Sequence, residues 1–271
     1  MSALPPDVRA LIDAIAAAAG DDSRRWRNPA DGSVMIRIPG GVGRLGGRKR
    51  SLGEVSLGAF SLARHPITNA QFAAFIDGTG YAPSVDHPDN DRYLTHWTLS
   101  SSGRRRPPEA LAEHPVVFVS WIDALHYCAW AGLTLPSEWC WERAAGGLKG
   151  RPYPWGGNRP HPRRNTHANL FGEATEPVGS YPDTRSAYGC QDMIGNVSEW
   201  CAPADDVAAL PAPLPPPAPA DAPALVPVRG SAFMRLSTRE GRMTTAHRRS
   251  LSATRRNRWT GFRPAARDPV E

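Results

Sequence analysis

The sequence is poor in cysteine and lacks the spacings that mark a cysteine-based metal or redox motif. Its 271 residues contain four cysteines, which are Cys128, Cys140, Cys190 and Cys201. None belongs to a CxxC pair, and no histidine lies at metal-ligand spacing from any of them. Such usage is typical of a protein with reduced thiols, so we expect a cytoplasmic protein.

Long hydrophobic runs are also missing. No segment approaches the roughly 18 consecutive apolar residues of a membrane-spanning helix, so we expect no membrane association. The first residues, MSALPPDVRALIDAIAAAAGDDSRR, have no basic start, and acids interrupt their apolar run. They therefore do not read as a signal peptide.

Acidic residues are nearly absent from the C-terminal region. Between Arg229 and Arg267 there are eleven arginines and one acid, Glu240, in a chain whose net charge is +6. Such a stretch is typical of a surface that binds phosphate or other anions. It is equally typical of a solvated face whose carboxylate partners lie elsewhere in the fold, and both interpretations stay open.

Proline, glycine and tryptophan are abundant, with 28, 25 and 9 residues. They indicate a loop-rich fold held together by large apolar side chains. Periodicity and capping residues predict helices over residues 5–19, 67–81, 120–132 and 133–147, strands over 33–41 and 114–121, and no helix after Arg151. Residues 202–227 are almost wholly proline, alanine and aspartate, so we predict a disordered insertion there.

A series of motifs occurs in a distinctive order, namely RHPITNAQFAAFIDGTGY, HPVVFVSWIDALHYCAWAG, LPSEWCWERAAGG, YPWGG, ANLFG, YGCQDMIGNVSEW, RGSAF and GFRP. Together they resemble the formylglycine-generating enzyme family, also called sulfatase-modifying factor domains. The resemblance implies an α+β fold, a loop-rich variant of the C-type lectin fold with two to three helices around small twisted sheets. We expect residues 1–32 to form an N-terminal helix and linker, and residues 33–266 to form this domain.

The motif MIGNVSEW offers a candidate calcium site. Asn196 and Glu199 are oxygen ligands three residues apart on a tight turn, and the carbonyls of Ile194 and Val197 can complete the site. The same two side chains can instead hydrogen-bond the turn. The resemblance implies calcium here, and a second site at Asn169 and the carbonyl of Leu170. The family's aspartate for that second site is missing from a shortened loop, where Glu173 or Glu176 could replace it.

The resemblance also locates the family's copper chemistry. Aerobic members carry two cysteines, five residues apart, which bind copper(I) through thiolates. Counting back from GFR, these positions fall on Arg235 and Glu240, neither of which can bind copper(I). We therefore expect no copper and no formylglycine-generating activity.

A non-enzymatic branch of the same fold provides the leading hypothesis. Variable proteins of diversity-generating retroelements bind ligands through the segment that precedes GFR. We therefore predict a non-catalytic lectin-like module that binds an acidic protein, peptide or other anionic ligand through Trp200, Phe233, Arg235, Arg239, Glu240, Arg242, Arg248, Arg255 and Trp259.

Two other functions stay open. The first is a metal-dependent oxidoreductase, using non-haem iron or copper, that modifies a peptide or small molecule. His161 and His167 are the closest histidine pair, but no nearby carboxylate completes a facial triad with them. The second, less favoured, is nucleic-acid binding through the arginines, which offer few aromatic side chains for base stacking.

Overall fold

The computed structural model describes residues 25–47, 51–101, 104–156, 168–203, 210, 212–233 and 243–267. The helix expected over residues 5–19 lies outside this part of the chain. Within it, no helix is long and apolar enough to cross a membrane.

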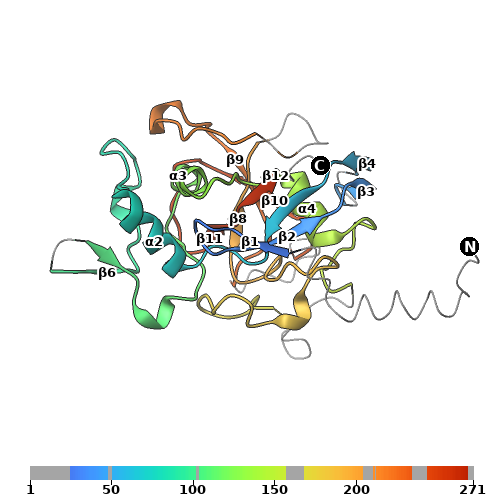
Figure 1. Cartoon of the computed structure of the whole chain (residues 1–271), viewed down its shortest axis with the longest axis horizontal. Coiled ribbons are helices and arrows are strands. Elements are labelled where there is room, and N and C mark those ends of the chain that lie inside the picture. The colour runs from blue at the N-terminus through green and yellow to red at the C-terminus, as the bar shows by residue number, and fades with distance from the viewer. Residues whose placement is uncertain are drawn as a thin grey trace, which may run out of the picture.

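Two four-stranded sheets form the centre of the molecule (Figure 1). The first is antiparallel and has the order β1-β2-β5-β12, with strands Arg25–Arg27, Val34–Ile38, Phe60–Ala63 and Ala265–Arg267. The second has the order β10-β9-β8-β11, with strands Arg248–Leu251, Val226–Arg229, Ser198–Trp200 and Thr260–Phe262. Its β8 and β11 pair in parallel. Because β11 and β12 are separated only by Arg263 and Pro264, this short connection joins the two sheets.

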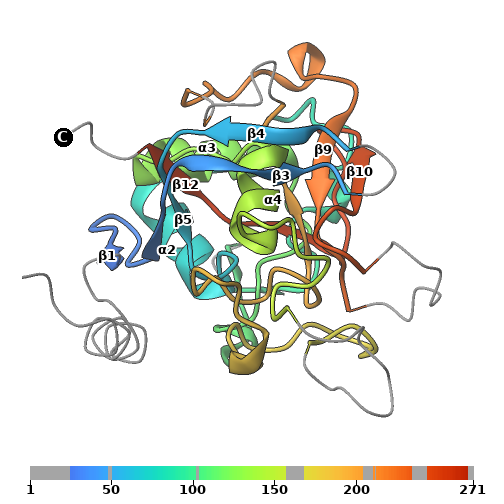
Figure 2. The same cartoon turned by 90° about the vertical axis from the view of Figure 1, so that its right-hand side faces the viewer.

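Smaller elements complete the fold. Two hairpins pair β3 with β4 and β6 with β7, which are Gly41–Leu45, Gly53–Leu57, Thr98–Leu99 and Arg105–Arg106. Single turns of 3-10 helix, η2 to η5, cover Asn90–Arg92, Glu109–Leu111, Pro182–Thr184 and Pro219–Asp221. In Figure 2 the β3–β4 hairpin lies over α4 (Glu138–Gly146), which also packs against β9.

The three predicted helices that lie in this part of the chain are present, and their caps explain their bounds. Thr68 caps α2 (Asn69–Thr79) and Ser120 caps α3 (Trp121–Ala131), each in a reciprocal capping box. Both helices end at a glycine in the left-handed conformation, Gly80 and Gly132. Ser137 caps α4. As predicted, the described residues after Arg151 contain no α-helix.

Two sequence predictions are wrong. Residues 114–121 form one isolated bridge at Pro115 rather than a strand, because Phe118 takes a left-handed φ of 57° that breaks an extended run. The insertion 202–227 is not disordered as a whole. Its residues 212–227 pack onto the domain, where Leu214 and Ala222 contact the core and β9 begins at Val226. A few well-placed apolar side chains order this proline-rich stretch.

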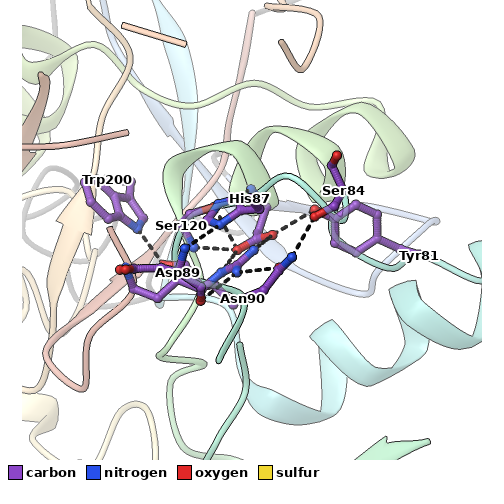
Figure 3. Close-up of polar contacts among 10 residues, drawn as sticks. Tyr81, Ser84, His87, Asp89, Asn90, Ser120 and Trp200 are labelled. Carbon is purple, nitrogen blue, oxygen red and sulfur yellow. Dashed lines mark hydrogen bonds and ion pairs between the residues drawn. The ribbon is translucent and has the colours of Figure 1, made fainter. Parts of the chain in front are cut away.

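A buried ion pair anchors the long polar loop after α2. Arg256 donates from Nε and Nη2 to the two carboxylate oxygens of Asp123, at 2.8 Å each. Both side chains are fully buried. Arg256 Nη1 also donates to the carbonyl of Asp89, and Tyr81 donates to Asp123 Oδ1 at 2.7 Å. Figure 3 shows Tyr81 and Asp89 on opposite sides of this network. The loop is therefore fixed onto α3 and the C-terminal segment.

We predict that Asp123→Asn will destabilise the protein by about 3–5 kcal/mol, because it leaves the Arg256 guanidinium buried without a counter-charge. Asp77→Asn is the control, since it breaks an ion pair with Arg106 whose side chains are 39% and 48% exposed. We expect the control to cost less than about 1 kcal/mol. Urea unfolding of both variants measures the difference, and equal costs would contradict the assignment.

The same pair predicts a pH dependence. Burial alone would raise the pKa of Asp123, but the hydrogen bonds and charge of Arg256 outweigh it and hold the pKa below its usual value. The ionised carboxylate therefore stabilises the fold at neutral pH, and this contribution is lost as the pH falls below about 4. The stability gap between wild type and Asp123→Asn should shrink over that range in urea titrations. A difference in unfolding free energy that stays constant down to acid pH would argue against a lowered pKa of Asp123.

Candidate functional site

The predicted calcium turn contains Asn196, whose backbone is in the left-handed conformation and whose side-chain amide is engaged in hydrogen bonds. Asn196 has a φ of 63°, and its backbone N–H donates to the carbonyl of Asn169 at 2.8 Å. Its side-chain Oδ1 accepts from the N–H of Glu176, and its Nδ2 donates to the carbonyl of the same residue, both at 3.0 Å. Asn196 thus fastens the loop before it, which is the alternative that the sequence left open.

Glu199 is the partner of Arg263. The carboxylate is completely buried, and its Oε1 and Oε2 each lie 2.7 Å from a donor of the Arg263 guanidinium. Oε2 also accepts from the indole of Trp141 at 2.7 Å. The remaining donors of Arg263 bind the carbonyls of Ala63, Arg64 and Gln191. All five N–H groups of this guanidinium therefore have acceptors.

These contacts do not fit a calcium ion at Glu199. Calcium requires six to eight oxygen ligands, and both oxygens of this carboxylate are held by a buried cation. Ile194 and Val197, whose carbonyls were expected to contribute, are each 1% exposed. Within the described residues, no three His, Cys, Asp or Glu side chains form a group that could hold a metal ion. Glu199 is thus assigned to an ion pair, and calcium binding stays a prediction.

The second predicted calcium site has its amide engaged as well. Asn169 Nδ2 donates to the carbonyl of Ala174 at 2.8 Å, and Leu170 is buried. Of the two possible substitute ligands, Glu176 hydrogen-bonds the Tyr181 hydroxyl through its side chain. The carbonyl of Glu173 accepts from Arg258. The Asn169 bond therefore holds the loop together locally, and the Arg258 bond ties the loop to the C-terminal segment.

The cysteines are free and buried. All four have exposed fractions of 2% or less. Burial raises the pKa of Cys140 and of Cys190 to about 11, and it raises those of Cys128 and Cys201 further. Protonated thiols are poor metal ligands and poor nucleophiles. Cys128 therefore acts as a small apolar core residue, as predicted.

Many of the C-terminal arginines are internal. Arg229, Arg256 and Arg263 are completely buried. Arg229 binds Glu138 and Glu142 of α4, and Arg248 Nη2 lies 2.7 Å from Glu138 Oε1. The carboxylate partners predicted elsewhere in the fold therefore exist, but much of the network is buried rather than solvated.

The structure corrects part of the predicted binding face. Trp200 is 0% exposed, and its indole donates to the carbonyl of Val119 at 3.1 Å, so it cannot contact a ligand. The reason is that β8 is covered on both faces. Arg248 is 32% exposed and paired, whereas Arg255 is 47% exposed and lies 3.9 Å from Asp89. Arg235, Arg239, Glu240 and Arg242 lie outside the described residues.

An aromatic patch borders the segment 234–242. We define the aromatic patch as Tyr153, Trp155, Phe171, Phe233 and Arg258. The rings of Tyr153 and Trp155 stack with centroids 5.4 Å apart, and the Arg258 guanidinium lies 5.3 Å from the Phe233 ring centroid. Phe233 was predicted to contact the ligand, but it is only 3% exposed, so it supports Arg258 rather than forming a contact surface itself. Tyr153, Trp155 and Phe171 pack half-buried against Leu170, Ile194 and Met243.

The aromatic patch is continuous with the ends of the segment 234–242. Phe233 precedes that segment and donates its N–H to the carbonyl of Asn196, which lies beside Ile194. Met243 follows the segment and belongs to the same apolar cluster. Trp259, half-buried, is adjacent to Arg258. In Figures 1 and 2 the yellow loops of residues 168–190 lie at the bottom of the view, away from β3 and β4.

Three members of the aromatic patch were missed as site residues by the sequence analysis, namely Tyr153, Trp155 and Phe171. They belong to the glycine-containing motifs YPWGG and NLFG, outside any helix or strand pattern. The sequence feature that could have identified them is the presence of large aromatic side chains in glycine-containing loops.

A serine and a histidine meet near Asp123, but they do not form a nucleophile. His87 Nδ1 accepts from the N–H of Asp89, so the ring proton is on Nε2, which donates to Ser120 Oγ at 3.2 Å. Ser120 in turn donates to Asp123 Oδ2 at 2.8 Å. Figure 3 shows His87 and Ser120 in this arrangement. The histidine is a donor and Ser120 is completely buried, so neither can activate a substrate.

We predict that Glu199→Gln will cost about 3–5 kcal/mol of stability, because Arg263 loses the buried carboxylate that binds its Nε and Nη2. The loss should be the same in millimolar calcium and in chelator when measured by urea unfolding. Glu109→Gln, at an exposed residue of η3, is the control and should be nearly neutral. A calcium-dependent stability that disappears only in Glu199→Gln would contradict the ion-pair assignment.

Comparisons with known proteins agree with the resemblance in the sequence. The chain is 34% identical over 216 residues to a formylglycine-generating enzyme of Thermomonospora curvata, covering 62% of this chain and 70% of the relative. It is 40% identical over 149 residues to a serine/threonine-protein kinase, Pkn1, of Chlamydia trachomatis, covering 55% of this chain. That match spans only 23% of the kinase's own length.

Solved structures share the fold. PvdO from Pseudomonas aeruginosa superposes with a TM-score of 0.65 at 22% identity, covering 90% of this chain and 97% of that chain. The Treponema denticola variable protein 1 gives 0.60 at 20% identity, covering 90% and 98%. The predicted α+β fold, with two to three helices around small sheets, is confirmed, and the described residues contain three α-helices. Because the model of the sulfatase-modifying factor enzyme 1-like domain matches residues 16–268, the chain belongs to the formylglycine-generating enzyme family.

Proposed function

We propose that this family member is a binding module that holds an acidic peptide segment of a partner protein against the aromatic patch and the adjacent segment 234–242. One observation carries the proposal: the stacked Tyr153 and Trp155 pack in the same cluster as Met243, which follows a segment with three arginines, and Arg258 covers Phe233, which precedes that segment. Aromatic rings and arginines are the side chains that dominate binding energy at protein interfaces.

The charge of this region supports an acidic ligand. Arg235, Arg239 and Arg242 lie in the segment with a single acid, Glu240. Guanidinium groups bind carboxylates with two parallel hydrogen bonds. Among the described C-terminal arginines, the exposed Arg255 and Arg258 add to this charge, whereas the buried ones do not. Nucleic-acid binding is less favoured because three of the eight described arginines of this region are completely buried.

The chemistry of the thiols supports binding rather than copper-dependent oxidation. Copper(I) requires thiolate ligands, and all four cysteines are buried with raised pKa values. The positions that align with the family's copper cysteines are Arg235 and Glu240. Free, buried thiols also suit the reducing cytoplasmic compartment that we propose for the protein.

The alternative is a metal-dependent oxidoreductase acting on a peptide or small molecule. It is favoured by the 34% identity with an enzyme that generates formylglycine. The test is oxygen consumption with a cysteine-containing peptide and added copper(I) or iron(II). Sustained turnover would establish this alternative and overturn the binding-only proposal.

We predict that labelled peptides rich in aspartate and glutamate, with one aromatic residue, will bind with a dissociation constant that rises with ionic strength. Trp155→Ala should weaken binding about 10- to 30-fold, because it removes half of the stacked aromatic pair. Arg235→Ala and Arg242→Ala should weaken binding without lowering the melting temperature. Fluorescence anisotropy measures all of these effects.

Arg104→Gln is the control for these variants, since Arg104 is exposed beside the β6–β7 hairpin and outside the aromatic patch. It should bind as wild type. Unchanged binding by Trp155→Ala, Arg235→Ala and Arg242→Ala would refute the location of the site. Equal affinity for peptides of reversed charge would refute the proposed class of ligand.

A further inference from the structure

A second concave site lies where the β1–β2 turn meets the connection between β5 and α2. It is a pocket of about 360 Å³ lined by parts of residues 27–34 and 63–71, with Glu113 and Val178. This volume is within the range of small-molecule sites. None of its lining residues belongs to the aromatic patch, so it is independent of the proposed peptide-binding function.

One wall of the pocket is fixed by hydrogen bonds. Gln71 Nε2 donates to the carbonyl of Asp31 at 3.2 Å and to Ser33 Oγ at 3.1 Å. The Asp31 carboxylate accepts from the N–H and hydroxyl of Ser33, and from the Tyr127 hydroxyl at 2.8 Å. The wall is therefore preorganised, and Asp31 has its acceptors occupied.

The pocket is also lined by Arg64, which has free donors within the described part of the chain. Arg64 Nε donates to Gln191 Oε1 at 2.9 Å. In the described part of the chain, no hydrogen bond or ion pair holds its two terminal nitrogens. These nitrogens form the end of the guanidinium fork, which matches two oxygens of a carboxylate or phosphate.

His65 contributes polarity but no charge. Its Nε2 lies 2.7 Å from the same Gln191 Oε1. Because Arg64 Nε is only a donor, that Gln191 atom must be an oxygen, and His65 Nε2 must also donate to it. Burial lowers the pKa of His65 to about 4, so the ring is neutral at neutral pH with Nδ1 as an acceptor.

The charge around Arg64 is positive and poorly compensated. Arg27 also lines the pocket, and Arg25 and Arg185 are close enough to affect Arg64 electrostatically. Burial, then the repulsion from Arg25 and Arg185, lowers the pKa of Arg64. Opposing these arginines are Asp31, which is engaged, and Glu113, which is exposed. A bound anion would relieve the repulsion among the guanidinium groups.

We propose that this pocket binds a small molecule through a carboxylate or phosphate group, which the terminal nitrogens of Arg64 hold. Arg27 adds positive charge, and the preorganised wall of Asp31, Ser33 and Gln71 bounds the rest of the pocket. The exposed Glu113 opposes the anion.

The test titrates the full-length protein with inorganic phosphate and, separately, with succinate at constant ionic strength, following the Arg Nε–H resonances by NMR. We expect saturable binding of one probe or both, and the tighter probe identifies the group. Arg64→Gln should weaken it about 10- to 100-fold, because two charge-assisted hydrogen bonds are lost. Arg104→Gln, at the exposed arginine outside both sites, should bind as wild type.

A second variant tests whether removing a negative charge from the pocket strengthens anion binding. Glu113→Gln removes an exposed carboxylate from the pocket and should tighten binding about two- to fivefold, which keeps the test decisive if Arg64→Gln fails to fold. The proposal is overturned if neither probe binds saturably, if Arg64→Gln binds as wild type, or if Glu113→Gln weakens binding. These outcomes leave the peptide-binding proposal untouched, because that proposal depends on the aromatic patch.

Discussion

The fold depends on one fully buried ion pair, between Glu199 and Arg263. Arg263 lies in the two-residue connection between β11 of one sheet and β12 of the other. Its guanidinium binds Glu199 of β8, the end of β5 through two carbonyls, and the turn at Gln191. Trp141 of α4 donates to the same carboxylate. Such a pair is costly to break, because either partner alone would be an uncompensated charge in the interior.

Other C-terminal arginines also form buried ion pairs, and these pairs limit how much positive charge the region can offer to a ligand. Arg256 fixes the loop after α2 through Asp123, and Arg229 fixes α4 through Glu138 and Glu142. Three of the eight described arginines in this region are therefore internal structural residues rather than basic surface. The face that we propose for a ligand is smaller, namely the aromatic patch and the arginine-bearing segment that borders it. A count of arginines in the sequence overstates the charge available for binding.

The sequence predicts well what depends on neighbouring residues. Helices α2 and α3 begin and end where Thr68, Gly80, Ser120 and Gly132 place them, because capping is a contact over a few residues. The family resemblance supplied the fold. The ion pair of Glu199 was not predicted, because its partner Arg263 is 64 residues away and a carboxylate three residues after an asparagine suits either a cation or a guanidinium. The packing of Leu214 was missed for the same reason, since its partners are distant in the sequence.

Our proposal is that this family member binds a ligand and does not oxidise it. Its most direct test is the metal content of the protein purified without chelator, measured by inductively coupled plasma mass spectrometry on the native full-length chain. The account predicts no stoichiometric copper or iron. One equivalent of either metal, retained through gel filtration, would contradict the account and establish a redox centre.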